Sequence, residues 1–408
     1  LVHNGVLTAR GREGSWYTGA GGSIYIHAAS IEGSGTMTAN GGVANSGAGG
    51  AGGRIAVILT GVGSDFSNYD IYANASARAG KTGDANQGGC GTIYAETVAD
   101  GANHGWLILK GTGTEPTKST DHYADPFSDV VTRLRLSKIT IAGKTKLAVC
   151  SGYVLDVTDT TFDCRDAGYG LYLNGGSVAA DDGTTCTLAD AEFPSETTLD
   201  GSFVIASGTV KVASKLTVTG DLTLKAGVSV KPVSNKTLQL VVNGNLTAEE
   251  GTSIDMTGMG YEYAHGPDGE TNESSGGTHG GWGTTTGRAE NGVTPYGSII
   301  DPQTYGTGGL QNNNGNSSSG GGVVRIEVGG ALTMDGSIRA NGKDFNHYAG
   351  AGGSVNITAA SLSGGENAVI EANGGKASNG TTGAAGGRVA VKLTGEGADF
   401  SGYLGTMT

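Results

Sequence analysis

Short stretches of alternating apolar and polar residues, separated by glycine-rich segments, recur along the chain. Four of these stretches share one form: Leu238–Val242 (LQLVV), Val324–Val328 (VRIEV), Val355–Ala359 (VNITA) and Val389–Leu393 (VAVKL). Alternation with a period of two places successive side chains on opposite faces of a β-strand. No segment shows the sustained i, i+3, i+4, i+7 apolar spacing of an amphipathic helix. The pattern therefore predicts an all-β chain with almost no helix.

The spacing of the strands indicates how they are arranged. The last three begin at nearly equal intervals, and a second strand ending in Ala-Asn-Gly follows, as in Gly336–Gly342 (GSIRANG). Between Leu216 and Met256 the unit recurs sooner, because the strand that begins at Leu216 is answered by the one that begins at Leu238. One such coil buries little apolar surface by itself. Coils stacked in parallel, about 4.8 Å apart, bury Val against Val and Ile against Ile.

We therefore predict a right-handed parallel β-helix, or β-solenoid, with glycine-rich lateral loops, because parallel crossover connections are nearly always right-handed. Gly and Asn tolerate positive φ, so Ala-Asn-Gly is expected to form corners. Four side chains are expected to be buried in stacked columns: Val355, Ile357, Val389 and Val391. A β-sandwich is the main alternative, but its tight antiparallel hairpins do not suit the long glycine-rich connections.

A much longer repeat also spans the chain. Gly19–Gly42 and Gly350–Gly375 have nearly the same sequence. Leu1 aligns with Leu332 and, after two small insertions, Tyr69 aligns with Tyr403. We interpret the chain as one long repeat plus the beginning of the next, within a longer protein. Three parts are expected: 1–110, the glycine-rich β-solenoid that ends one repeat; 111–237, a slimmer β-helix section after a loop excursion; and 238–408, a glycine-rich β-solenoid with a long flap at 258–321 and the next repeat from 332.

Composition excludes several classes of protein. The 408 residues include 77 Gly but only 7 Pro, and there is no Gly-X-Y period, so the chain is not collagen-like. Only 15% of the residues are charged, with a net charge of −13, which argues against nucleic acid or an anionic membrane surface as partner. No apolar run approaches the length of a membrane-spanning helix, so no membrane span is expected in this segment.

The motifs themselves carry a resemblance. GGSVNITAASLSG, ANGG, GGRVAVKLTG and DFSGY, with YGSIIDPQTYGTGG before VVRIEVGGALTMDGSIRANG, resemble the glycine-rich tandem-repeat β-solenoid regions of very large secreted or surface proteins. Such proteins occur in bacteria and in some protists and algae. The resemblance covers residues 1–95 and 238–408. It implies an extracellular or cell-surface location and carries no established catalytic residues.

Cysteine spacing offers one candidate disulfide. The four cysteines are Cys90, Cys150, Cys164 and Cys186, and they show no CxxC spacing, which argues against a zinc site. Cys164 and Cys186 are separated by about one short coil and share the same strand parity. They are therefore either stacked neighbours joined by a disulfide or two free buried thiols in one column.

Acidic residues supply the main enzymatic candidate. They gather around Arg165 in the middle part: Asp163, Asp166, Asp181 and Asp182. Polysaccharide lyases on β-helices use acidic calcium ligands and a basic residue on one wall, but Asp-Asp-Gly is also ordinary turn chemistry, and we favour solvated turn residues. His265 and Asp268–Glu270 could bind Ca²⁺ through oxygen ligands, although the EF-hand and nonapeptide spacings are absent. No catalytic residue, cofactor-binding residue or metal ligand is assigned.

Asn-x-Ser/Thr sequons are candidate N-glycosylation sites. There are seven: Asn74, Asn235, Asn245, Asn272, Asn316, Asn356 and Asn379. Roughly five would arise by chance in a chain so rich in these residues, so the number alone does not indicate glycosylation. Asn356 is expected to face outward if Val355 and Ile357 face inward.

These observations favour a structural protein rather than an enzyme. The expected role is a stiff extracellular rod or filament segment, with adhesion as an added role, that associates with copies of itself end to end or laterally and with extracellular polysaccharide. The alternative is a carbohydrate-active enzyme of the polysaccharide-lyase kind, or a carbohydrate-binding module, on the same scaffold. Fold alone does not separate the two, because function resides in sites.

Overall fold

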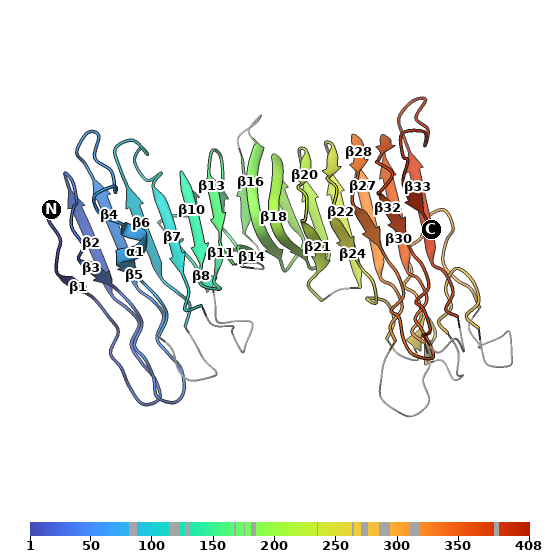
Figure 1. The fold of residues 1–408 in the computed structure, drawn as a ribbon, viewed down its shortest axis with the longest axis horizontal. Coiled ribbons are helices and arrows are strands. Elements are labelled where there is room, and N and C mark those ends of the chain that lie inside the picture. The colour runs from blue at the N-terminus through green and yellow to red at the C-terminus, as the bar shows by residue number, and fades with distance from the viewer. Residues whose placement is uncertain are drawn as a thin grey trace. The chain divides into compact units, whose positions relative to one another are not determined.

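The computed structural model describes residues 1–80, 88–113, 123–127, 130–166, 169–174, 176–180, 185–234, 236–262, 265–270, 276–284, 294–309, 318–378 and 383–408. They form two compact units, Leu1–Glu192 and Phe193–Thr408, and each is described by itself. Within the described residues the chain is almost all β, and α1 (Ile71–Asn74) is the one helix (Figure 1). The predicted all-β chain with almost no helix is confirmed.

Short strands build both units. The first unit contains β1 (Val6–Thr8), β2 (Ser23–Ala28), β3 (Thr36–Thr38), β4 (Arg54–Leu59), β5 (Ala75–Ser76), β6 (Thr92–Glu96), β7 (Trp106–Lys110), β8 (Tyr123–Ala124), β9 (Arg133–Arg135), β10 (Lys138–Ala142), β11 (Lys146–Cys150), β12 (Val154–Asp156), β13 (Thr161–Cys164), β14 (Leu171–Asn174), β15 (Ser177–Ala179) and β16 (Thr185–Phe193). The second unit contains β17 (Thr197–Asp200), β18 (Ser202–Val212), β19 (Lys215–Val218), β20 (Leu222–Leu224), β21 (Ser229–Pro232), β22 (Thr237–Val242), β23 (Leu246–Ala248), β24 (Ser253–Asp255), β25 (His265–Gly266), β26 (Gly269–Glu270), β27 (Val323–Val328), β28 (Ala331–Met334), β29 (Ser337–Arg339), β30 (Ser354–Ala359), β31 (Ser361–Ser363), β32 (Val369–Glu371), β33 (Arg388–Leu393) and β34 (Thr406–Met407).

Parallel ladders dominate the second unit, with neighbouring strands supplied by successive passes of the chain. β22, β27, β30 and β33 lie side by side (Figure 1), and Val324 pairs with Val355, which pairs with Val389. These are the strands that recur at nearly equal intervals in the sequence, so the predicted parallel pairing is confirmed. Between Leu216 and Met256, where the sequence unit recurs sooner, Leu216 pairs with Leu240. The sequence spacing matches Leu216 with Leu238, which lies two residues earlier on the same face of that strand.

A second set of parallel strands in this unit follows the same order. β29, β32 and β34 are neighbours, and Ile338 pairs with Ile370, which pairs with Met407. Ile338 and Ile370 are fully buried, as are Val324 and Val355. Like side chains therefore stack above like side chains along each ladder, which removes apolar surface that a single pass could not bury.

The first unit begins with the same arrangement. β2, β4 and β6 pair in parallel, and Ile55 on β4 lies beside Ile24 and Ile93 on its two neighbours. Ile55 and Ile93 belong to a buried apolar cluster with Val57 and Met37, and Met37 comes from the second ladder, β1–β3–β5. Strands β2, β3 and β4 thus correspond to β30 (Ser354–Ala359), β32 (Val369–Glu371) and β33 (Arg388–Leu393) at the second occurrence of the repeated sequence.

An antiparallel junction then interrupts the first unit. β6 and β7 pair antiparallel, with Ile93 opposite Ile108 and Tyr94 opposite Leu107. Ile108 faces the cluster that contains Ile93, whereas Leu107 lies on the other face of the sheet, in line with Ile139 on β10. The buried side of one continuous sheet therefore changes at this junction, and strand direction changes with it.

Glycine in the Ala-Asn-Gly motif serves close approach of backbones. Neither Gly41 nor Gly342 has positive φ, and neither does Asn40, so the positive φ expected for this motif is wrong. A Cβ atom on Gly41 would lie 2.0 Å from the carbonyl oxygen of Gly50, which no side chain permits. Hydrogen bonds of 2.6–2.7 Å from glycine N–H groups to alanine carbonyl oxygens also join segments that are separated in sequence: Gly22 to Ala9, Gly53 to Ala39, Gly91 to Ala77, Gly353 to Ala340 and Gly387 to Ala372.

Candidate functional site

The apolar interior of the second unit is open beside β33 and β34. Each of these strands lies at the end of its sheet among the described residues. Val355 and Ile357 on β30 are fully buried, but their partners Val389 and Val391 on β33 are only half-buried. The expectation that all four are buried is therefore right for the first two and wrong for the last two, because no described strand covers the outer edge of β33.

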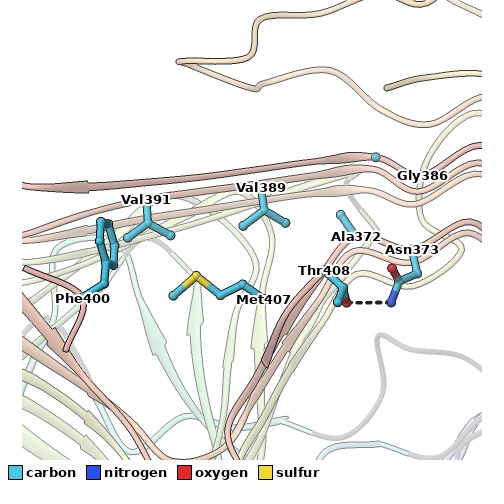
Figure 2. Close-up of a pocket in the computed structure, with 9 residues that line it drawn as sticks. Ala372, Asn373, Gly386, Val389, Val391, Phe400, Met407 and Thr408 are labelled. Carbon is cyan, nitrogen blue, oxygen red and sulfur yellow. Dashed lines mark hydrogen bonds between the residues drawn. The ribbon is translucent and has the colours of Figure 1, made fainter. Parts of the chain in front are cut away.

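A pocket of about 430 Å³ marks this opening. Val389 lies across the pocket from Met407, and Phe400 forms one end (Figure 2). Phe400 is half exposed, so the lining presents apolar surface to solvent. At the polar end, the side-chain amide of Asn373 donates to Oγ1 of Thr408 at 3.0 Å (Figure 2).

The first unit contains the same face in a covered state. The long repeat matches β33 to β4, with Arg388 in the place of Arg54. There, Ile93 and Ala95 on β6 pair with Ile55 and Val57 on β4, and all four are at most 1% exposed. In the first unit, β6 therefore covers the apolar face beside β4. In the second unit, no described strand covers the equivalent face beside β33.

Corner asparagines connect successive passes of the chain. The Asn341 side-chain carbonyl accepts the backbone N–H of Asn373 at 2.7 Å, and the Asn40 side-chain carbonyl accepts that of Arg78 at 2.7 Å. The sequence pattern indicates a backbone role for Asn in this motif but does not indicate this side-chain contact. The signal was the recurrence of Ala-Asn-Gly at 39–41, 340–342 and 372–374.

Parts of the predicted flap at 258–321, which belong to the second unit, pack beside strands β30 and β33 of that unit. The backbone N–H of Gly280 donates to the carbonyl of Gly386 at 2.9 Å, and the Ser354 hydroxyl donates to the carbonyl of Thr304 at 2.6 Å. We name the described residues 276–284 and 294–309 the lateral segment. Arg388 on β33 also holds it, since its Nε atom donates to the carbonyl oxygen of Tyr296 at 2.9 Å.

His279 lies at the centre of the lateral segment and is fully buried. Its Nδ1 atom is 2.7 Å from the carbonyl oxygen of Gly352, and its Nε2 atom is 2.8 Å from Oγ1 of Thr304. Its ring packs against Tyr296, with centroids 4.9 Å apart. Burial lowers the pKa of His279 to about 4, with a smaller contribution from the charge of Arg388.

The acidic stretch around Arg165 is not brought together as a lyase-like wall by the described residues. Asp163 forms an ion pair with Arg165, whose Nη2 lies 2.9 Å from the carboxylate, and the guanidinium also lies 4.2 Å from the centre of the Tyr72 ring. Asp181 and Asp182 lie outside the described residues. The Asp163 carboxylate is therefore occupied by a neighbouring cation.

The remaining carboxylates of interest have turn or surface positions. Asp166 accepts the backbone N–H groups of Gly143 and Lys144, at 2.6 and 3.2 Å, and both of these residues have positive φ. Asp166 thus stabilises a turn, as favoured from the sequence. His265 and Asp268 are exposed, and the part of the chain that the structure describes holds no group of three metal-ligating side chains around them or elsewhere.

The candidate disulfide stays a prediction. Cys164 is a free thiol in the structure, and burial raises its pKa to about 12. The side chain of Cys186 lies outside the described residues. Cys90 and Cys150 are free thiols too.

The sequons differ in accessibility. Asn356 does not face solvent as expected: it is buried beneath the lateral segment, and its side-chain amide donates to Asp301 at 2.6 Å. Asn245 is exposed, but its side-chain oxygen accepts the N–H of Ala331 at 2.9 Å. Asn74 is half-buried at the end of α1. The others lie outside the described residues: Asn235, Asn272, Asn316 and Asn379.

Comparisons with known proteins give no relative for this chain. No family model matches the sequence, and neither a similar curated protein nor a similar solved structure was found. Among the described residues, no helix has the length and apolar character needed to cross a membrane.

Proposed function

We propose that the chain is a segment of a right-handed parallel β-helix and serves as a stiff structural rod outside the cell. Each coil of this rod supplies the surface on which the next coil packs. The observation that carries this proposal is the open apolar face at β33 and β34. Its equivalent in the first unit is covered by β6, whose Ile93 and Ala95 lie on Ile55 and Val57. A further coil, from the same protein or from another copy, would cover Val389 and Val391 in the same way.

The antiparallel junction between β6 and β7 is compatible with one continuous coil. Reversal of strand direction alone would invert the winding of the chain around its axis. Here the buried face of the sheet reverses as well, with Ile93 facing one side and Leu107 the other. The two reversals compensate, so coils before and after the junction keep the same hand, and parallel crossovers favour the right hand.

The chemistry of the described walls supports a structural role over a lyase role. The Asp163 carboxylate is paired with Arg165, and the Asp166 carboxylate accepts two backbone N–H groups. Neither is poised to take a proton from a substrate. The extracellular location rests on the resemblance to secreted and surface repeats, and lateral contacts between copies or with polysaccharide are part of the same proposal.

Sedimentation velocity and electron microscopy over a range of protein concentrations test the proposal. End-to-end association into rods is expected, because an uncovered apolar face and an unpaired strand edge recruit further strands. Val391→Glu places a charge in the 430 Å³ pocket and should abolish association. Val62→Glu is the matched control, since Val62 is 94% exposed. Monomers at every concentration, or equal loss with both variants, would contradict the proposal.

A further inference from the structure

The free edge of β33 in the second unit lies between two pockets. No described strand pairs with its outer edge. The pocket of about 430 Å³ on the inner side includes Met407, and a second pocket of about 930 Å³ on the outer side includes Ala390. Val389 and Val391 line both pockets, and Figure 2 shows them in the first. A strand added at this edge would therefore point alternate side chains into the two pockets.

The covered edge of β4 in the first unit indicates which side chains fit the inner pocket. There, Ile93 and Ala95 of β6 pair with Ile55 and Val57 of β4, and all four belong to one buried apolar cluster. The long repeat places the two valines of β33 at the positions of Ile55 and Val57. An aliphatic residue and a small apolar residue, two positions apart, would cover these valines in the same way.

The outer face of the same strands accommodates aromatic rings. Tyr94 of β6 and Tyr25 of β2 both pair with Ala56, whose small side chain leaves room for a ring on either side. Ala390 is the repeat equivalent of Ala56. It pairs with Asn356 on one side, and no described residue pairs with it on the other. A tyrosine would fit at that second position.

Two exposed isoleucines extend this outer pocket. Ile299 and Ile300 of the lateral segment line it together with Ala390, although they are 74% and 83% exposed. The Ser298 hydroxyl accepts the backbone N–H of Ile300 at 3.2 Å, which stabilises the turn that presents the two side chains. A tyrosine ring beside Ala390 would cover apolar surface of these isoleucines that is now in contact with water.

Charge on the outer side favours the same kind of strand. Glu96 of β6 pairs with β4 at the position that Lys392 holds in β33. Lys392 is exposed, and it forms no ion pair with any described residue. Asp301 and Asp399 line the same pocket, but each already accepts a hydrogen bond of 2.6 Å from a neighbouring side chain. An acidic residue opposite Lys392 would therefore gain an ion pair.

We propose that the β33 edge binds an extended polypeptide strand of the sequence form Ile-Tyr-Ala, parallel to β33. The isoleucine and the alanine enter the inner pocket, and the tyrosine enters the outer pocket against Ile299 and Ile300. This is the sequence of β6, and β2 shares its first two residues, Ile24 and Tyr25. The inference rests on the proposed function, because a further coil would supply the strand, and it assigns to the lateral segment the selection of that strand.

Fluorescence anisotropy of labelled peptides tests the proposal, with the full chain at concentrations where it sediments as a monomer. The reference peptide has the sequence of residues 88–99 with Cys90→Ser. In a control peptide of the same composition, Ile93 and Tyr94 are exchanged, which turns the ring inward. The exchanged peptide should bind at least about tenfold more weakly, because both side chains then face the wrong pocket. Equal binding of the two peptides, or no binding of the reference peptide, would overturn the proposal.

Variants of the chain locate the contact with the tyrosine. The double variant Ile299→Ser, Ile300→Ser should weaken the reference peptide about tenfold but should not weaken a Tyr94→Ala peptide, because the ring and the isoleucines form one contact. Val391→Glu should abolish binding of both peptides, and Val62→Glu, at a 94% exposed position, should leave both unchanged. Circular dichroism confirms that each variant is folded. Equal weakening of both peptides by the isoleucine variant would overturn the proposal.

The peptide assay is separate from the association of whole chains. Chains that stay monomeric but prefer the reference peptide to the exchanged one would contradict the rod and support the strand-binding edge. Chains that associate but bind the two peptides equally would support the rod and overturn the strand-binding edge.

Discussion

The Nδ1 atom of His279 lies 2.7 Å from the carbonyl oxygen of Gly352, and this contact defines the tautomer of the imidazole. A carbonyl oxygen only accepts, so Nδ1 carries the proton and Nε2 accepts the hydroxyl of Thr304, 2.8 Å away. The neutral ring therefore satisfies both nitrogens inside the protein. A second proton on Nε2 would break the contact with Thr304 or force its hydroxyl to turn.

The lateral segment should loosen in acid. His279 has a pKa of about 4 when folded and an ordinary value of 6.5 when unfolded, so the unfolded state binds the proton first as pH falls. The stability contributed by the neutral ring is complete above about pH 6.5 and is lost as pH falls towards 4, with a total of roughly 3 kcal/mol. Hydrogen exchange of the Gly277 and Gly280 amides, followed between pH 7 and 4, measures the loss.

His279→Gln separates this effect from general acid sensitivity. The variant should be less stable at pH 7 but should lose the pH dependence of exchange in the lateral segment. His27→Gln, at an exposed position on β2, should retain it. Identical pH profiles for the native chain and His279→Gln would show that another group is responsible.

Stacked apolar columns should dominate the stability of the second unit. Ile357 is fully buried and pairs with Ile326 on one side and Val391 on the other. Ile357→Ala should lower the free energy of unfolding by roughly 3 kcal/mol, because it leaves a cavity between two ladders. Urea denaturation of the variant measures the loss. Val62→Ala, at a 94% exposed position, should change stability by less than about 0.5 kcal/mol.

The register of the ladders could be predicted from sequence because the side chains themselves repeat. Val324, Val355 and Val389 are paired as their spacing indicates, since a slip of one residue would turn the whole apolar set outward. The apolar pattern alone does not predict the reversed direction of β7, because Trp106–Leu109 has the same apolar character as the parallel strands. A signal did exist: β6 and β7 are separated by a short connection that contains Gly101 and Asn103 at positive φ, too short for a full coil.

Other features depend on residues distant in the chain. Asn356 alternates correctly with Val355 and Ile357, so it was expected at the surface, but Asp301 of the lateral segment covers it. Arg54 of β4, Tyr94 of β6 and Leu134 of β9 likewise line one pocket of about 730 Å³ in the first unit, although they are far apart in the sequence. No local pattern encodes either contact.

The Cys90 thiol should react slowly in the folded protein. Burial raises its pKa to about 11, against smaller opposing effects such as the contact with the Thr145 hydroxyl at 3.2 Å. At pH 8 its thiolate population is about a hundredfold below that of an ordinary cysteine, so alkylation by iodoacetamide should be slower by at least that factor. Peptide mass spectrometry measures the rate for each cysteine. Unfolding in urea should remove the difference, and rapid labelling of Cys90 without urea would contradict the buried position.

The same peptide maps test the candidate disulfide. A bridge between Cys164 and Cys186 would protect both from alkylation in urea until a reductant is added. Two free thiols would both be alkylated in urea alone. Either result decides between the two alternatives that the sequence leaves open.

Neighbouring glycines should differ sharply in their tolerance of a methyl group. A Cβ atom on Gly387 would lie 2.1 Å from the carbonyl oxygen of Gly353, whereas one on Gly386 would meet nothing within 4 Å. Gly387 also donates its N–H to Ala372 at 2.6 Å, so the backbone cannot move away without breaking that bond. Gly387→Ala should therefore lower the free energy of unfolding by at least about 2 kcal/mol. Gly386→Ala should be neutral or stabilise by up to about 1 kcal/mol, because it restricts only the unfolded chain. Urea denaturation of the two variants compares them directly, and equal stabilities would show that close backbone approach does not explain the glycine content.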